Sequence, residues 1–284
     1  MNVLQEVRRR HKLAKARGGR GHRLRKAKKI LYPMLQERWY QNQIEGLVKA
    51  YAEVIRQKLY PAITKAVAGN QIHTPEVLKH DSWADDLNDS MDSTDDYEDR
   101  LFGESSVADL ATRFATQVSD FNRRQVEKSV SALVGFEVFA DEPWLAGQME
   151  AFTNQNVDLI GKLGKEMKGD IGATVMREVA AGTRVEEIQS LIEDRFHVHE
   201  SRARLIGRDQ TNKFNGGLNK LRQTSLGLEK YRWQGVEDER ERDSHLDLQD
   251  EIRVWGEGIE PGEEIQCRCW AEPVIEGTDL EEAA

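Results

Sequence analysis

The chain has 284 residues, enough for one large domain or two modest ones. Its 38% hydrophobic and 32% charged residues are typical of a globular protein on the polar side, and no run of 18 apolar residues predicts a membrane span. The basic N-terminus lacks the apolar run of a secretory signal. One residue separates Cys267 from Cys269, a spacing that would strain a disulfide, so we expect synthesis in a reducing compartment such as bacterial cytoplasm.

The charge is distributed unevenly. Residues 1–40 carry 13 Lys and Arg against two acids, whereas the remainder has a net charge of −20. We therefore predict a basic flexible arm over residues 1–30, disordered until it meets an anionic partner. Its candidate nucleic-acid-binding residues are Arg8, Arg9, Arg10, Lys12, Arg20, Arg23, Arg25, Lys26, Lys28 and Lys29. These bases would bind DNA phosphates without sequence readout, and base stacking is not expected because no aromatic residue precedes Tyr32. A solvated tail without a partner is the alternative.

A long amphipathic helix is predicted in the region 31–80. Its apolar residues follow three-and-four spacing from Ile44 to Leu59, and Pro61 closes the run. Residues 81–100 are predicted to be an acidic linker, because positions 81–99 hold nine acids and no Lys or Arg.

The region 101–226 is predicted to be a helical domain. Apolar stripes indicate helices over 107–121 and 145–163, and a further helix near 175–179 ends at Gly182. A short helix follows the Thr183/Glu186 capping-box pattern, and a separate one runs from about 200 to 226.

The pattern changes after Gly227. Apolar residues two apart, as in the pairs Tyr231/Trp233 and Ile252/Val254, predict short strands in a small β-rich module over 227–275. An acidic tail over 276–284 completes the chain. The predicted fold class is α+β, with a mainly α-helical body and a small β-rich C-terminal module.

The C-terminal module contains candidate metal ligands. Cys267 and Cys269 would share one face if they lie on a strand, and with His245 and either Asp238 or Asp243 they offer donors that zinc takes. A structural zinc ion would stabilise a module with little apolar surface. Packed free thiols are the alternative, because paired zinc cysteines usually have two residues between them.

The same loop could also be interpreted as catalytic. Asp238, Asp243 and His245 would be its carboxylates and general base, but the interleaved Arg240 and Arg242 favour structural ion pairs. We therefore expect that the loop holds no catalytic residues and that the protein is not an enzyme.

Four motifs in the C-terminal half form a specific combination. They are a helix over 202–211, the aromatic segment 231–233, an Asp-x-Arg-x-Arg-x-x-His loop over 238–245, and a Pro-Gly ending at Cys267-Arg268-Cys269. With them, residues from about 145 to 275 resemble the phage Mu F-like minor head proteins, also called the phage head morphogenesis family. One departure is in the helix, where the family usually reads Ile-Ala-Arg-Thr-Glu and this chain reads Ile-Gly-Arg-Asp-Gln over 206–210.

The resemblance implies a minor head protein of a tailed bacteriophage. It would lie inside the capsid at the portal vertex of the virion and act in procapsid assembly and genome packaging or delivery. Its implied partners are the portal protein, scaffold or major capsid protein, and packaged DNA through the basic arm; no membrane partner is expected. Two alternatives stay open: a metal-dependent nucleic-acid hydrolase, and a DNA-binding accessory protein outside the virion.

Overall fold

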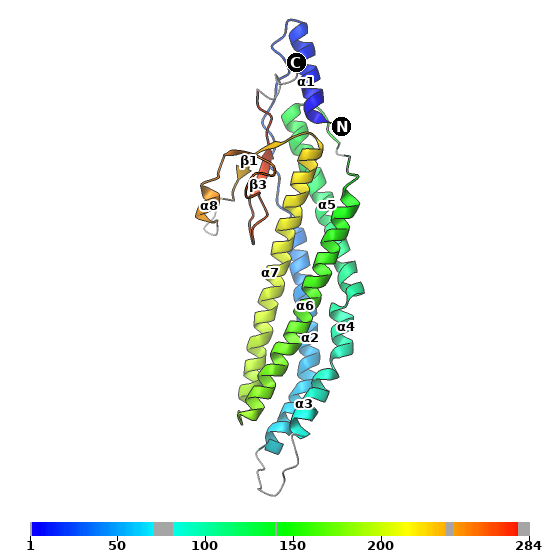
Figure 1. The fold of residues 1–284 in the computed structure, drawn as a ribbon, viewed down its shortest axis with the longest axis vertical. Helices are drawn as coiled ribbons and strands as arrows, with labels where there is room; N and C mark the ends of the chain where they lie inside the picture. Colours follow the sequence, from blue (N-terminus) through cyan, green and yellow to red (C-terminus); the bar gives the residue numbers. More distant parts are fainter. Residues whose placement is uncertain (1, 71–81, 140, 237–240, 278–284) are drawn as a thin grey trace. The chain divides into compact units, whose positions relative to one another are not determined.

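The fold is helical with one small sheet. The computed structural model describes residues 2–70, 82–139, 141–236 and 241–277 (Figure 1). Its elements are α1 (Val3–Ala16), α2 (Met34–Asn70), α3 (Ser82–Asp92), α4 (Asp95–Phe102), α5 (Glu104–Val134), α6 (Leu145–Ala180), α7 (Val185–Ser225), β1 (Lys230–Gln234), α8 (Asp243–Leu246), β2 (Ile252–Val254) and β3 (Trp270–Pro273). The predicted α+β class with a helical body is confirmed. Within the described part of the chain, no helix is long and apolar enough to cross a membrane.

The chain forms two compact units, each assembled from separated segments. Unit 1 comprises residues 1–37, 114–150 and 208–284, and unit 2 comprises residues 38–113 and 151–207. The boundaries fall within α2, α5, α6 and α7.

Unit 2 is built from helices whose apolar stripes are buried. The predicted stripe of α2 is buried from Ile44 to Leu59, and it continues through Ile63 beyond Pro61. The helix therefore does not end at the proline as predicted, because burial of the following turns outweighs the hydrogen bond that proline removes. Gly164 of α6 brings that helix close to α4, since an added Cβ would lie 2.6 Å from the Phe102 ring.

The acidic region 81–100 differs from the predicted linker. It contains α3 and most of α4, which bury Leu87, Met91 and Phe102. Lysines from other helices offset the acids: Lys65 Nζ lies 2.7 Å from Asp86, and Lys168 pairs with two more acids of this region. The sequence count missed these lysines because they come from α2 and α6.

Two predicted helix breaks are absent. α6 continues past Gly164, Gly169 and Gly172, and α7 is one helix of 41 residues rather than a short helix followed by a second one. The buried Phe196 and Ala203 continue the apolar stripe of α7 across the expected gap.

The first 30 residues of unit 1 also differ from the prediction. Instead of a flexible arm, they contain α1 and an extended segment whose Val3, Val7, Ala27 and Ile30 are buried against α5 and the residues after α7. The backbone is also held, since Val3 N donates to the Leu226 carbonyl oxygen at 2.8 Å. The many Lys and Arg residues led to the prediction of a solvated segment. Its few apolar residues, however, occupy positions on one face.

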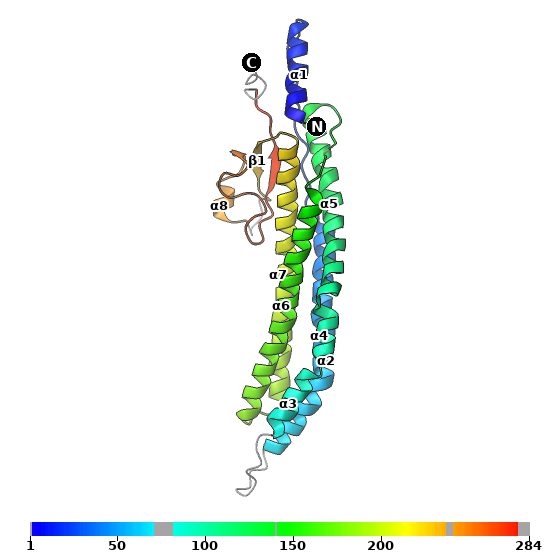
Figure 2. The ribbon, with the colours of Figure 1, turned by 45° about the vertical axis from the view of Figure 1, so that its right-hand side comes forward.

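The β-rich module contains a three-stranded antiparallel sheet in the order β2-β1-β3. Both views place β1 and β3 beside the C-terminal half of α7 (Figure 1 and Figure 2). Tyr231, Trp233, Trp255 and Ala271 form its small buried cluster. The predicted strand through Cys267 and Cys269 is absent, because β3 begins only at Trp270 and the cysteines lie in the irregular segment between a turn and β3.

Candidate functional site

One histidine and two cysteines meet beside the sheet of unit 1. His245 lies on the short helix α8, and Cys267 and Cys269 flank Arg268 just before β3. The Nδ1 atom of His245 is 3.7 Å from the Sγ atom of Cys267 and 3.5 Å from that of Cys269. All three candidate ligand atoms lie within 4.8 Å of one another.

The turn that precedes the cysteines is fixed against α7. An added Cβ at Gly216 of α7 would lie 2.5 Å from the Pro261 carbonyl oxygen, and Gly262 has a φ of +90°, so both positions require glycine. Gly262 N then donates to Cys267 Sγ at 3.3 Å. The Pro-Gly motif thus places a backbone donor on the first sulfur.

The ring orientation of His245 is set by a carboxylate. Its Nε2 atom lies 2.9 Å from Glu264 Oε2, and because a carboxylate only accepts, Nε2 carries the proton. The Nδ1 atom of the same ring faces the two sulfurs. Trp233 packs edge-on against the ring at 5.3 Å between centroids, and His245 is 3% exposed.

The thiols interact with each other and with a second acid. A hydrogen bond from Cys269, together with one from the Gly262 backbone, lowers the pKa of Cys267. The shared hydrogen bond and burial raise the pKa of Cys269. Cys269 Sγ also lies 3.3 Å from Glu241 Oε1, which is a second acceptor for the same thiol proton. At neutral pH this arrangement favours one thiolate between the two sulfurs.

The predicted ligand set is therefore brought together in part. His245, Cys267 and Cys269 meet, Asp238 lies outside the described residues, and Asp243 is exposed at the start of α8. Sequence reasoning missed Glu241, which faces Cys269 from within the same loop. It also missed Glu264, which lies close to the Pro-Gly motif.

A pocket of about 230 Å³ opens beside this cluster. Glu241, Arg242 and Arg268 are among its lining residues. Arg242 also pairs with Glu264, so the arginine and His245 share one carboxylate. The interleaved arginines were expected to form ion pairs, and Arg242 does so.

The basic residues of the N-terminal segment present their charges outward. Of the ten candidate nucleic-acid-binding residues, nine are exposed and Arg8 is half-buried. Arg9 and Arg10 both pair with Glu6 at 2.7 Å, and Arg10 also lies 4.0 Å from the Phe136 ring centroid. The segment is thus anchored by its apolar side chains while its bases face solvent.

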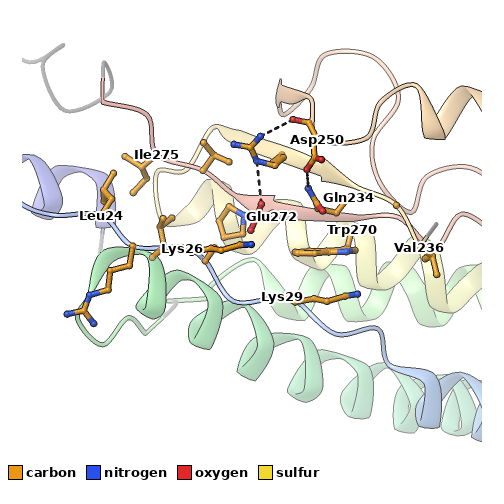
Figure 3. Close-up of a pocket in the computed structure, with 16 residues that line it drawn as sticks. Leu24, Lys26, Lys29, Gln234, Val236, Asp250, Trp270, Glu272 and Ile275 are labelled. Carbon is orange, nitrogen blue, oxygen red and sulfur yellow. Dashed lines mark hydrogen bonds and ion pairs between the residues drawn. The ribbon is translucent and has the colours of Figure 1, made fainter. Parts of the chain in front are cut away.

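Part of this basic segment lines a second pocket, of about 850 Å³. Figure 3 shows Lys26 and Lys29 extending along the side of β3 that carries Trp270. Arg232 of β1 lines the same pocket and is held by the Asp250 carbonyl oxygen at 3.0 Å and by Glu272 at 3.5 Å. Sequence reasoning set base stacking aside because no aromatic residue precedes Tyr32, and it missed Trp270, which is some 240 residues away in the chain.

Comparison with known proteins gives two matches. Residues 169–272, which include α7, β1, β2, His245 and both cysteines, match the family described as "Phage Mu protein F like protein". An "Uncharacterized protein" of Haemophilus influenzae (strain ATCC 51907 / DSM 11121 / KW20 / Rd) is 24% identical over 270 residues, covering 90% of this chain and 57% of that protein. The chain thus spans little more than half the length of this relative. No solved structure matches. The resemblance predicted from the motifs is confirmed, because residues 169–272 match the phage Mu F-like family.

Proposed function

We propose that the protein acts in head morphogenesis of a tailed bacteriophage, as a minor head protein associated with the portal inside the capsid. The observation that carries this proposal is the phage Mu F-like region over 169–272. It includes all of α7, β1 and β2, so the similarity extends over folded elements of both units as well as short motifs. The role is one of assembly and interaction.

Contact with packaged DNA is the second part of the proposal. Lys26 and Lys29 lie on an exposed segment whose backbone is anchored, so they bind phosphates without the cost of ordering a free tail. Trp270 in the same pocket supplies an aromatic face next to these bases. Such a surface would bind nucleic acid by charge, without reading its sequence.

The test is the protein content of purified particles. We expect the protein in heads at few copies relative to the major capsid protein, and its loss from particles that lack the portal. Deleting its gene should yield heads that are misassembled or lack DNA, and the wild-type gene supplied in trans should restore them. Absence from particles, or copies as numerous as those of the shell subunit, would contradict the proposal.

The DNA part is tested separately in the same system. A gene encoding Lys26→Gln/Lys29→Gln should restore particle assembly but give heads with less packaged DNA. Full restoration of packaging would contradict the role of these lysines while leaving the assembly role intact.

A further inference from the structure

The His245–Cys267–Cys269 cluster has the spacing of a metal site. Tetrahedral zinc bound at about 2.3 Å to sulfur and about 2.05 Å to nitrogen holds those two atoms about 3.6 Å apart. The two Nδ1–Sγ distances in the structure are 3.5 and 3.7 Å. Both nitrogen–sulfur separations therefore already match those that one tetrahedral ion would impose, and all three donor atoms lie within 4.8 Å of one another.

The chemistry of the donors selects the ion. Two sulfurs and one imidazole nitrogen are soft and borderline ligands, which zinc takes and which magnesium or calcium do not. We infer that His245, Cys267 and Cys269 bind a structural zinc ion, with Glu241 as the fourth ligand. This inference does not rest on the proposed role in the phage head.

Glu241 fits the fourth position better than Asp243, the loop aspartate that the structure describes. Its Oε1 atom is 3.3 Å from Cys269 Sγ, close to the separation of about 3.6 Å expected for an oxygen and a sulfur on one tetrahedral zinc. Asp243 is exposed, whereas Glu241 contacts Cys269 and lines the pocket beside the cluster. Zinc binds both sulfurs as thiolates, so the one thiol proton that the pair still holds is released to solvent, and Glu241 exchanges the hydrogen bond from Cys269 for the metal.

The surroundings of the cluster support the same conclusion. Metal-bound histidines usually donate their second ring N–H to a carboxylate, and His245 Nε2 does so to Glu264. The Gly262 backbone N–H donates to Cys267 Sγ, as it would to a bound thiolate. These two partners orient the ligands before any ion arrives.

The position of the cluster explains what the ion would do. It joins the segment around α8 to the segment that precedes β3, next to a sheet whose own buried cluster holds four residues. Small modules of this kind enclose little apolar surface and gain stability from a metal. The zinc would thus be structural, with all four positions taken by protein.

The experiment uses the full chain, purified without a His tag from zinc-supplemented medium. Elemental analysis should give one zinc per chain, and a strong chelator should lower the melting temperature. Cobalt(II) exchanged into the site should show a thiolate-to-metal charge-transfer band and the d–d bands of tetrahedral coordination. Sub-stoichiometric zinc with unchanged melting in chelator would overturn the inference and leave two packed thiols.

Variants separate the ligands from their neighbours. Cys267→Ser, Cys269→Ser and His245→Asn should lose the metal, while His199→Asn, a buried histidine of unit 2, retains it as the matched control. Glu264→Gln should weaken zinc affinity by roughly 10- to 100-fold, as removal of an outer partner does. The cobalt spectrum of the wild type keeps the inference testable even if the cysteine variants fail to fold.

The fourth ligand has its own comparison. Glu241→Gln should weaken zinc affinity and alter the cobalt d–d bands, whereas Asp243→Asn and Asp238→Asn leave both unchanged. If an aspartate variant alters the spectrum and Glu241→Gln does not, the assignment of Glu241 is wrong, although the three-residue core stands.

Discussion

Arg222 of unit 1 is a fully buried charged residue that pairs with a carboxylate and donates hydrogen bonds to two polar side chains. Its guanidinium lies 2.6 Å from Glu142, which is itself nearly buried, and it donates to Asn122 and Ser119. We predict that Arg222→Ala lowers the free energy of unfolding by about 3–5 kcal/mol, because it leaves Glu142 buried without its counter-charge. Chemical denaturation measures this.

The control for Arg222 is an exposed arginine with a carboxylate partner. Arg184 pairs with Glu187 on the surface, and Arg184→Ala should cost less than about 1 kcal/mol. Equal losses in the two variants would show that the buried pair carries no special stability.

His199 of α7 should make the stability depend on pH. Burial lowers its pKa, although Asp170 lies 3.4 Å away and acts in the opposite direction. A histidine with a lowered folded pKa contributes its full stability above its unfolded pKa of about 6.5, and loses it as pH falls below that value. The melting temperature should therefore fall between pH 7.5 and pH 5.

His199→Asn isolates this contribution. The variant should melt lower than the wild type at pH 7.5, with a smaller further loss on acidification, as measured by thermal scans at matched pH values. If the two proteins lose stability in parallel, His199 does not titrate on unfolding in this range.

The sequence showed which residues of the C-terminal half could form a site more readily than it showed which of them are in contact. The spacing of Cys267 and Cys269 and the presence of His245 were enough to nominate a common site, and the structure brings the three together. Glu241 and Glu264 could not be selected among the many acids nearby. Their roles depend on which way a turn directs each side chain.

The N-terminal segment combines a basic composition with a buried apolar face. Its bases dominate the composition, but Val3 and Val7 lie on one face of α1 and are buried. We predict that deleting residues 2–29 lowers the free energy of unfolding by more than about 3 kcal/mol, since several apolar side chains leave the core. Urea denaturation is the measurement.

Lys26→Gln/Lys29→Gln is the matched change that leaves the core untouched. Both lysines are exposed, so the free energy of unfolding should stay within about 0.5 kcal/mol of the wild type. A deletion that unfolds like the wild type would instead support a segment that packs weakly.

The elements that were predicted correctly have long, regular apolar stripes. α2 is the clearest case: its stripe predicted the helix, and only its end, placed at Pro61, was wrong. α3 and α4 were missed because a few buried residues and lysines from other helices outweigh a local excess of acid. Charge counted along the sequence cannot include partners from elsewhere in the chain.

At the scale of the whole molecule, the fold class and the family resemblance could be inferred, but the assembly of the units could not. Unit 1 draws on three segments separated by more than 50 residues. Local periodicity carries no information about such distant pairings. The predicted domain boundaries follow composition along the chain, whereas the two units follow contacts between separated segments.

The charge distribution of the whole chain predicts how the protein binds DNA. Its net charge of −9 opposes binding, so any affinity for DNA must come from local clusters such as the one containing Lys26 and Lys29. We expect binding to duplex DNA without sequence preference and with an affinity that falls as salt rises. Lys26→Gln/Lys29→Gln should lower the slope of log affinity against log salt by up to about 2, roughly one for each lost phosphate contact.

A charge-matched variant decides whether the location of these lysines matters. Lys49→Gln/Lys162→Gln removes two exposed lysines of unit 2 and changes the net charge equally, so its slope should stay near that of the wild type. Fluorescence anisotropy with a labelled duplex at several salt concentrations measures all three proteins. Equal effects of the two double variants would indicate that only net charge matters. An unchanged slope in Lys26→Gln/Lys29→Gln would show that these exposed lysines do not bind nucleic acid. The partner of the basic segment would then be an acidic protein surface.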